Sequence, residues 1–453
     1  MQSFEINKED LERIKTALES NDAELEKVLE DYHASEIAIL FERLPLEARE
    51  KIINVLPSEV ASEVISEMDE EQDPAELLIN LDPEKRSEIV EELDYDDATD
   101  LISQLDEEDQ QEILEDIDEE DASNIRALMT YADDTAGGLM NPEVIKANIH
   151  MDKKEALDEI IRQSEEMEEF YTIYAVDDDD ILQGILSLKT IIKAHANVKV
   201  GSMVNNDFVF VKADLDQEEV AKLISQYNLT TIPVVDDHMK LLGRITVDDI
   251  IDVMEQESTE DILKISGVSE DEELSGNWKD AVKSRLPWLV INLGTAYLAA
   301  SIIRHFDKTI EQLAIISAYM TIIAGMGGNA ATQALAVTVR RISLSDLTDK
   351  QAYYTVFKEF LVGLINGAAN GLIVLVIALF YDANIMLGVV LFLAMTGNLI
   401  VAGLTGASIP LILKRVGIDP AVASSIIITT FTDCAGFLLP LWLATEFLLK
   451  HHH

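Results

Sequence analysis

The sequence is short of cysteine and of the motifs that carry catalysis. Its 453 residues include one cysteine, Cys434, so an internal disulfide and a zinc site built from cysteines are both excluded. It has no Walker loop and no G-x-S-x-G elbow, and its histidines cluster only at His451–His453, which we interpret as a cloning remnant. Since ATP hydrolysis and covalent catalysis lack their usual residues, we predict that the protein is not an enzyme.

Basic residues are scarce in the first 285 positions. The chain has 34 basic and 85 acidic residues, and the part from Leu286 onward holds nine of each. Residues 1–285 therefore hold 25 basic and 76 acidic residues. So acidic a segment repels the phosphates of nucleic acid and favours cations as partners, although a charged face that keeps the segment soluble is the simpler explanation of any single carboxylate.

Charge is rare in the last third of the chain, which contains five long apolar segments. They lie at about 286–306, 312–339, 354–381, 385–413 and 420–449. Each exceeds the roughly 20 residues that cross a hydrocarbon core as a helix. Basic residues gather before the first segment, between the second and third, and between the fourth and fifth. We therefore expect a cytosolic acidic part, five spans and a C-terminus outside the cell membrane.

Residues 44–128 repeat at about twelve residues. Units such as "LDPEKRSEIVEE" from Leu81 and "LDYDDATDLISQ" from Leu93 open with an apolar residue and an Asp or Pro suited to capping a helix. Two amphipathic turns follow in each unit. The pattern predicts short helices stacked as a superhelix, which is typical of a scaffold.

A second duplication covers residues 138–258. "AVDDDDILQGILS" (175–187) aligns with "VVDDHMKLLGRIT" (234–246) at an offset of 59. Each copy predicts a helix, a strand, an acidic turn, a strand and a helix, and two such half-buried units must pack against each other. The second copy resembles a CBS domain, and the pair resembles a CBS tandem, a regulatory module that often binds nucleotides or metal.

The CBS resemblance bears on Thr246 and Asp249. They lie in "GRITVDD", where adenosine-binding members place a hydroxyl and a ribose-binding carboxylate. The first copy, "GILSLKT", has no such acid. ATP is therefore a candidate ligand of the second copy, with Asp249 as a metal ligand the alternative.

Acidic side chains crowd two places along the chain. One group lies in the superhelix and the other at the end of the second CBS copy and beyond it: Asp94, Asp96, Asp97 and Asp100, then Asp249, Asp252, Glu257, Glu260 and Asp261. Like charges a few ångströms apart repel strongly in a partly desolvated cleft. We expect divalent cations to draw these parts together, so both groups are candidate regulatory metal sites.

The fifth apolar segment, "SSIIITTFTDCAGFLLPLWL" (424–443), carries one aspartate at its centre. A carboxylate there costs on the order of 2.5–3.5 kcal/mol, so we do not expect Asp433 to face lipid. Ser425, Thr429 and Asp433 recur every four residues and share one helical face. The segment is either part of an ion pathway or holds a buried carboxylate that neighbouring hydroxyls satisfy.

Glycines mark the second and third apolar segments. The second contains "GMGGNAATQ", with Gly325, Gly328 and Asn329 on one side, which permits close approach either to another helix or to an ion and its water. In the third segment glycines recur every four residues, and there we expect helix packing: Gly363, Gly367 and Gly371.

The order of these parts resembles the MgtE family of magnesium channels over nearly the whole chain. The most specific motifs are "RLPWLVINL" (285–293), "GGNAATQ" (327–333), "GIDPAVAS" (417–424) and "TTFTDCAG" (429–436). Ala331 and Ile426 replace residues usual in the family. The resemblance implies a homodimer with its fifth spans around a central pore and Asp433 as the pore aspartate. It also implies regulatory metal ligands at Asp94, Asp97, Asp249, Asp252, Glu257, Glu260 and Asp419.

Magnesium suits such a sparse oxygen site. Mg²⁺ sheds water reluctantly and commonly uses one or two carboxylates with retained waters. Beside Asp433, we expect Thr429 and the Gly325–Asn329 stretch to receive the ion's waters. Mn²⁺, Co²⁺ and Ca²⁺ stay open as alternatives. Two other functions stay open as well: a secondary transporter that couples a divalent cation to Na⁺ or H⁺, and a membrane-anchored nucleotide or metal sensor that moves no ion.

We therefore predict a multidomain membrane protein. It comprises an all-α superhelical N-terminal domain (1–131), an α/β tandem CBS domain (132–258), a connecting helix of plug type (259–285) and a five-span α-helical transmembrane domain (286–450). Its predicted function is Mg²⁺ uptake through a selective channel that cytosolic Mg²⁺ closes.

Overall fold

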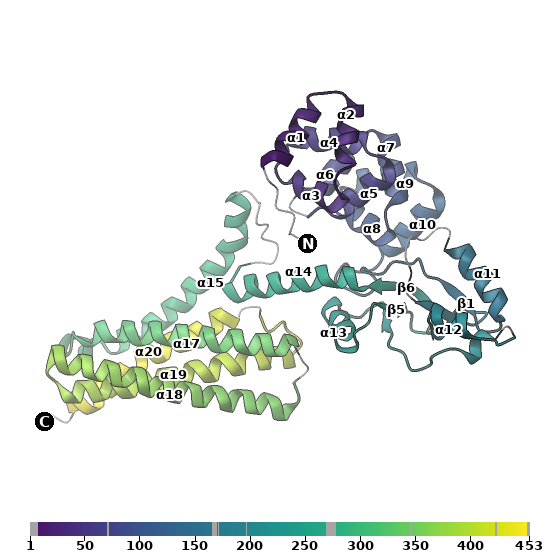
Figure 1. Cartoon of the computed structure of the whole chain (residues 1–453). Coiled ribbons are helices and arrows are strands. Elements are labelled where there is room, and N and C mark those ends of the chain that lie inside the picture. The colour runs from purple at the N-terminus through teal and green to yellow at the C-terminus, as the bar shows by residue number, and fades with distance from the viewer. Residues whose placement is uncertain are drawn as a thin grey trace. The chain divides into compact units, whose positions relative to one another are not determined.

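A computed structural model describes residues 8–69, 72–164, 170, 172–195, 197–268, 278–344, 347–421 and 424–450. The chain forms two compact units, Met1–Glu255 and Gln256–His453, each of which is described by itself (Figure 1). The terminal histidines and residues 269–277 of the expected connecting segment lie outside the described residues.

Short helices build the first half of the first unit, as the repeat predicted. They are α1 (Lys8–Leu18), α2 (Asp22–Leu29), α3 (Ala34–Phe41), α4 (Leu46–Val55), α5 (Ser58–Ser66), α6 (Pro74–Ile79), α7 (Pro83–Glu92), α8 (Tyr95–Ser103), α9 (Glu107–Asp116) and α10 (Glu119–Leu128). Their inward Ile and Leu side chains form one continuous core, in which Ile53, Ile89 and Ile113 are fully buried. The predicted all-α superhelix is confirmed.

Aspartates precede the last four of these helices at the N-cap position. Asp82, Asp94, Asp106 and Asp118 stand before α7, α8, α9 and α10, yet none accepts a capping hydrogen bond through its side chain. Their negative charge still favours the positive end of the helix dipole. Because capping does not engage it, the carboxylate of Asp94 stays available to neighbouring groups.

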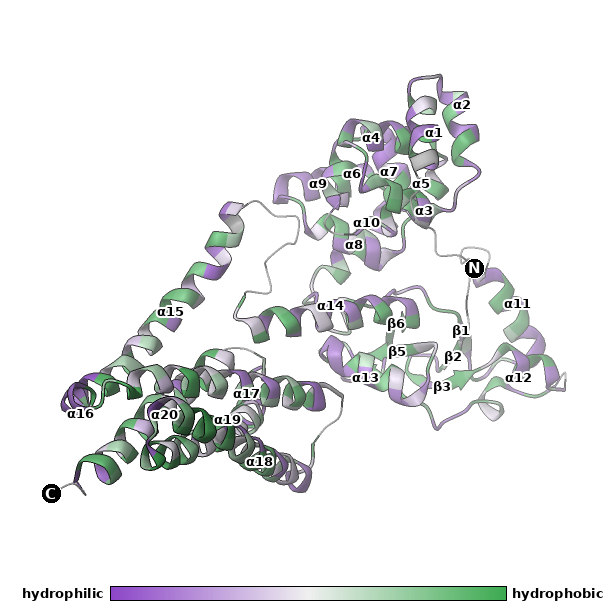
Figure 2. Cartoon of the chain, turned by 60° about the vertical axis from the view of Figure 1, so that its left-hand side comes forward, coloured by the Kyte–Doolittle hydropathy of each residue, from purple (hydrophilic) through white to green (hydrophobic). Residues whose placement is uncertain are grey.

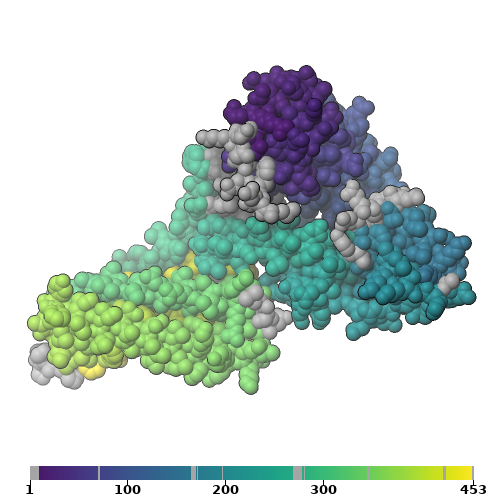
Figure 3. Space-filling view, in the orientation of Figure 1, coloured from purple at the N-terminus to yellow at the C-terminus, as the bar shows by residue number. Residues whose placement is uncertain are grey.

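Two small sheets follow in the same unit, which Figure 3 shows in purple, blue and teal atoms. Each sheet has one parallel and one antiparallel pair of strands. The first contains β1 (Lys146–Asn148), β2 (Ile173–Val176) and β3 (Leu182–Leu186), with α11 (Lys153–Gln163) and α12 (Leu188–Lys193). The second contains β4 (Val211–Lys212), β5 (Thr231–Val235) and β6 (Leu241–Thr246), with α13 (Gln217–Tyr227) and α14 (Val247–Ser266). The α/β tandem is confirmed, and each copy has one strand more than the sequence indicated.

The acidic turns of the duplication have a structural role. In the first, Asp177 Oδ1 accepts hydrogen bonds from two backbone N–H groups of its own turn, both at 3.0 Å. In the second, Asp236 Oδ1 accepts the two equivalent bonds, both at 2.8 Å. These carboxylates stabilise the hairpin turns, which is a structural role for one oxygen of each.

The two copies pack against each other. Tyr174 Oη and Thr231 Oγ1 form a buried hydrogen bond of 3.1 Å between them. Each copy also pairs with the segment that leads into the other. The backbones of Asn141 and Arg244 bond at 2.8 Å in both directions, and those of Asn205 and Ile185 bond at 3.0 and 3.2 Å. The predicted packing of one copy on the other is confirmed.

The second unit is helical and apolar, as the green ribbons of α17–α20 in Figure 2 show. Its helices are α15 (Trp278–His305), α16 (Asp307–Gln312), α17 (Ile316–Leu344), α18 (Asp349–Asp382), α19 (Ile385–Arg415) and α20 (Ser424–Ala444), followed by a π-helical turn at Thr445–Leu449. By length and composition, five of the described helices can cross a membrane, namely α15 and α17–α20. The five predicted spans are confirmed, whereas the short helix α16 was not predicted.

Glycines bring α18 and α19 together. A Cβ added at Gly363 would lie 2.4 Å from the carbonyl oxygen of Leu399, and one added at Gly371 would lie 2.8 Å from that of Phe392. A Cβ added at Gly367 would lie 2.8 Å from Cα of Thr396. The third segment thus uses its glycines for helix packing, as predicted.

Candidate ion pathway and regulatory sites

The helix α20 carries Asp433 near its middle, half-buried within this one chain. Its neighbouring hydroxyls are engaged by the backbone of their own helix. Thr429 Oγ1 donates to the carbonyl of Ser425 at 2.9 Å, and Thr432 Oγ1 donates to that of Thr429 at 3.0 Å. Among the described residues, none donates a hydrogen bond to the Asp433 carboxylate. The geometry therefore does not support the alternative of a carboxylate satisfied by hydroxyls of its own chain.

Helices α17 and α20 approach closely beside Asp433. A Cβ added at Gly436 would lie 2.7 Å from Cα of Ala324. The two helices run in opposite directions, since Ile428 belongs to the same hydrophobic cluster as Ala331 while Leu441 belongs to the same cluster as Met320. Asp433 lies one turn before Gly436, so it is level with the residues one turn after Ala324. Those residues are the glycines of the "GMGGNAATQ" motif.

Two glycines of this motif face open space. A Cβ added at Gly325 or at Gly328 would meet no described atom within 4 Å. Gly327 differs, because its added Cβ would lie 2.2 Å from Nδ2 of Asn398 on α19, which donates to the carbonyl of Ile323 at 2.8 Å. Within this chain, helix packing thus explains Gly327 but not Gly325 or Gly328. Asn329 is exposed on the same helix.

Carboxylates gather in the first unit where α8 begins. Burial, and then the charges of Asp97 and Asp249, raise the pKa of Asp96 well above its ordinary value. Burial raises the pKa of Asp97 to about 6, although Ser66 Oγ donates a hydrogen bond of 2.7 Å to it. These shifts show that Asp96 and Asp97 lie close enough to Asp249 to feel its charge.

The same cluster includes Asp94 and Asp252. The charges of both oppose the ionisation of Asp97, and burial raises the pKa of Asp252 itself. No described Lys or Arg lies within 4 Å of these two or of the other three carboxylates. Asp96 Oδ1 is buried without a hydrogen-bond partner. Hard oxygen ligands of this kind suit a divalent cation such as Mg²⁺, but no three of the five described carboxylates place ligand oxygens within 4.8 Å of one another in this conformation.

Thr246 and Asp249, the candidate nucleotide ligands, are bonded to each other. Thr246 precedes α14, and its backbone N–H donates to Asp249 Oδ2 at 3.1 Å while its hydroxyl donates to the same oxygen. Burial raises the pKa of Asp249 and these hydrogen bonds oppose the shift. The pair therefore caps the start of α14 through Oδ2 of Asp249, which engages one of the two carboxylate oxygens that a ribose could use.

The second unit contains the other expected regulatory residues. Lys264 lies between Glu260 and Asp419, forming an ion pair with the first and a 2.9 Å pair with Asp419 Oδ2. Ser343 Oγ donates to Asp261 Oδ2 at 3.2 Å, and Glu257 is half-buried one turn before Asp261. The structure thus brings Glu260 and Asp419 together around an ammonium group, which sequence reasoning did not single out.

Comparison with known proteins decides the family. The magnesium transporter MgtE of Thermus thermophilus is 33% identical over 436 residues, which cover 95% of this chain and 97% of that protein. The chain belongs to the MgtE family. The MgtE of Enterococcus faecalis is 35% identical over 327 residues, 72% of each chain. Three family descriptions match in order: the MgtE intracellular N domain at 32–134, CBS domains at 136–197 and 200–256, and the MgtE divalent cation transporter at 320–443.

Solved structures resemble the cytosolic part of this MgtE-family chain. One is the cytosolic domain of the Mg²⁺ channel MgtE in complex with ATP, 36% identical with a TM-score of 0.51 over 54% of this chain and 99% of that one. Another is the soluble part of a magnesium transporter, 26% identical with a TM-score of 0.50 over 55% and 98%. With its five apolar helices, the protein is a multi-pass membrane protein that has a soluble N-terminal part.

One group of carboxylates in this MgtE-family chain escaped the sequence reasoning. Glu91, Asp118 and Asp121 place carboxylate oxygens within 4.8 Å of one another, the one such triple among the described residues. Asp121 Oδ1 accepts from Tyr95 Oη at 2.7 Å, and Glu91 accepts from the backbone of Asp118 at 3.0 Å. The residues come from α7 and α10, so only folding brings them together, and their own chain already engages two of them.

Proposed function

We propose that the protein is a Mg²⁺-selective channel for uptake and that two copies form the pore. In this proposal the α20 helices of both subunits flank a narrow aqueous axis in the cell membrane, with the N-terminal unit in the cytosol and the C-terminus outside. The proposed chemistry is the passage of an ion without catalysis. The family membership and the five apolar helices support it.

The unpaired carboxylate of Asp433 is the observation on which the pore depends. It lies at mid-helix among apolar neighbours and accepts no hydrogen bond from a described residue. A charge so placed is stable only if a second subunit, water or a cation compensates it. The open faces of Gly325 and Gly328 at the same level leave room for a hydrated ion. Two such carboxylates on one axis bind a hydrated divalent cation without stripping its water.

We assign gating to the cytosolic carboxylates. The cluster of Asp94, Asp96, Asp97, Asp249 and Asp252 carries more negative charge than its burial favours, since burial and mutual repulsion raise the pKa values of Asp96 and Asp97. Cytosolic Mg²⁺ relieves that repulsion and holds α8 against α14. In the second unit Glu257, Glu260, Asp261 and Asp419 offer further oxygen atoms, with Lys264 as the competitor of a metal ion.

Flux through purified protein in liposomes tests the pore. We expect Asp433→Ala to abolish Mg²⁺ flux, while size-exclusion chromatography shows a folded dimer. Asp382→Asn is a matched control, because Asp382 lies at the end of α18 and bonds to Tyr319 Oη at 2.6 Å. Unchanged flux in Asp433→Ala would make the carboxylate structural and the pore assignment wrong.

Reversal potentials separate this channel from the coupled transporter. A channel gives a reversal potential that follows the Mg²⁺ gradient alone, whereas coupling to Na⁺ or H⁺ shifts it with those gradients. A sensor without transport gives no Mg²⁺ flux at all. For ATP, calorimetry on the full chain and on Asp249→Ala decides whether the carboxylate that closes α14 also holds a ribose.

A further inference from the structure

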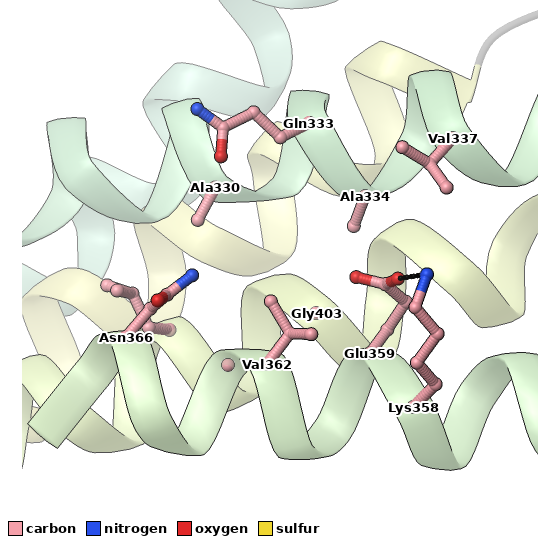
Figure 4. Close-up of a pocket in the computed structure, with 11 residues that line it drawn as sticks. Ala330, Gln333, Ala334, Val337, Lys358, Glu359, Val362, Asn366 and Gly403 are labelled. Atoms are coloured by element: carbon pink, nitrogen blue, oxygen red, sulfur yellow. Dashed lines mark ion pairs between the residues drawn. The ribbon is translucent and has the colours of Figure 1, made fainter.

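A cavity of about 250 Å³ lies between α17, α18 and α19 (Figure 4). Gln333 and Val337 of α17 line one wall, Glu359 and Asn366 of α18 line the other, and α19 closes the floor at Gly403. Val337 is 50% exposed and Val362 is 40% exposed, so the cavity opens on the side of the helix bundle. It contains no part of α20, and hence no part of the candidate pore.

Glu359 gives this cavity its charge. Its side chain is 7% exposed, and its Oε1 lies 3.3 Å from Nζ of Lys358. No described residue donates a hydrogen bond to its other oxygen. Figure 4 shows that this oxygen points into the space beneath Ala334. A carboxylate so buried favours a further donor, since an unsatisfied acceptor in low dielectric is costly.

The ion pair lies at one boundary of the apolar part of α18. From Phe360 to Tyr381 no residue is charged, and that stretch spans the roughly 30 Å of a hydrocarbon core. On α17, Arg340 and Arg341 lie one helical turn after Val337, which lines the cavity. The opening is therefore at the depth where acyl chains give way to lipid headgroups.

The charges of the cavity disfavour a metal ion. Glu359 is its only carboxylate among the described lining residues, and Lys358 already neutralises it. A divalent cation beside Glu359 would lie close to the ammonium of Lys358, which repels it. A primary ammonium suits the site better, because it carries a single charge and offers N–H donors to the free carboxylate oxygen of Glu359.

We propose that this cavity binds the headgroup of a phospholipid that carries a primary ammonium, as phosphatidylethanolamine does. The ammonium donates to Glu359, and the phosphate of the same lipid pairs with Lys358, whose side chain is 47% exposed. The acyl chains then lie along Val337 and Val362. A trimethylated headgroup has no N–H donor, so phosphatidylcholine lacks the deciding contact.

Native mass spectrometry of the full chain, released from bilayers of phosphatidylcholine with phosphatidylethanolamine or phosphatidylglycerol added, tests the site. We expect the unmutated protein to retain phosphatidylethanolamine in preference to the other two. Glu359→Gln keeps the shape and removes the charged acceptor, which lowers that retention by roughly tenfold. Glu446→Gln is the matched control, because it breaks the Lys450–Glu446 ion pair near the end of the last span and leaves retention unchanged.

A second variant keeps the test decisive if Glu359→Gln folds poorly. Val337→Trp narrows the opening and leaves both charges in place, so it also lowers retention of phosphatidylethanolamine. Equal retention of phosphatidylcholine and phosphatidylethanolamine by the unmutated protein would refute the proposal. So would a loss of bound Mg²⁺ rather than of lipid in Glu359→Gln. Neither result bears on Asp433, because the pore test uses a different helix and a different readout.

Discussion

The cytosolic cluster and the membrane helix use carboxylates in opposite ways. In the first unit five aspartates lie without a described basic partner, and burial, followed by the charges of neighbouring aspartates, raises the pKa values of Asp96 and Asp97. In the second unit Asp433 is a single carboxylate in its span. Between these extremes, Glu260 and Asp419 share the ammonium of Lys264.

Under the proposed function, the contrast in charge density matches the different times for which the two sites would hold an ion. A sensor must hold its cation long enough to change a conformation, and many carboxylates give that affinity. A conducting site must release the ion, so binding there has to be weak. In the proposed channel, one carboxylate per subunit would serve the second purpose and the cluster of aspartates would serve the first.

The largest effects are expected when one carboxylate of each group is neutralised, Asp433 in α20 and Asp97 in the aspartate cluster. Asp433→Asn is expected to lower Mg²⁺ flux by roughly 100-fold or more, because it removes the negative charge that compensates the ion in the proposed pore. Asp97→Asn is expected to leave maximal flux unchanged and to weaken inhibition by internal Mg²⁺. Patch recordings over a range of internal Mg²⁺ separate the two effects. If both variants lost flux equally, the division of labour would be wrong.

Two glycine variants of α17 separate a role in helix packing from a role in the proposed pore. Gly327→Ala forces a Cβ into Asn398 and is expected to destabilise the protein by about 1–3 kcal/mol. Gly328→Ala meets no described atom, so the chain keeps its stability while the added methyl group narrows the ion's path. Thermal unfolding in detergent and liposome flux measure the two quantities. Destabilisation by Gly328→Ala without loss of flux would assign that glycine to packing instead.

The dependence of stability on pH tests the aspartate cluster of the first unit. Because burial raises the pKa of Asp97 to about 6, its protonated form stabilises the fold, and that stability is lost as pH rises from about 4 through 6. In EDTA the unfolding temperature of the cytosolic unit is therefore expected to fall by a few degrees over this range. Millimolar Mg²⁺ cancels the fall, since the cation replaces the proton. Calorimetry of the full chain measures both, and Asp97→Asn should flatten the profile.

The smallest effect is expected at Lys264. Lys264→Met leaves Glu260 and Asp419 without their shared ammonium, so a cation takes its place more readily. The internal Mg²⁺ needed for half closure is expected to fall by about two- to fivefold. Lys222→Met is the matched control, because Lys222 pairs with Glu218 and Glu219 on a helix of the other unit. An unchanged closing concentration would show that no metal ion uses this pair.

The two internal repeats allowed most of the fold to be predicted from the sequence. The period of about twelve residues placed Asp82, Asp94 and Asp106 before their helices, and the offset of 59 aligned the two CBS copies. Both are local patterns, so they need no knowledge of distant contacts. The short helix α16 and the unbroken run of α14 across residue 258 lack such a signal.

The site residues also divide into those that a local sequence pattern marks and those that only folding brings together. Asp433 stood out because a charge in an apolar run is visible locally, and Thr246 with Asp249 three residues later is a readable start of a helix. By contrast, Lys264 meets Asp419 across 155 residues of sequence, and the Glu359 cavity needs three helices. Nothing in the neighbouring sequence marks either one, because the contact exists only after folding.

The exchange of leading segments between the CBS copies has a consequence for how the tandem unfolds. Asn141 lies before β1 of the first copy but pairs with the edge of β6, and Asn205 lies before β4 of the second copy but pairs with the edge of β3. A Cβ at Gly243 or at Gly184 would lie 2.6 or 2.5 Å from the carbonyl oxygen of the inserted segment, so both edges are shaped to receive it. Separating the copies exposes backbone groups at two edges at once. We therefore expect the duplicated halves to unfold in one cooperative transition, since a fragment that carries a single copy lacks backbone pairing that only the other copy provides.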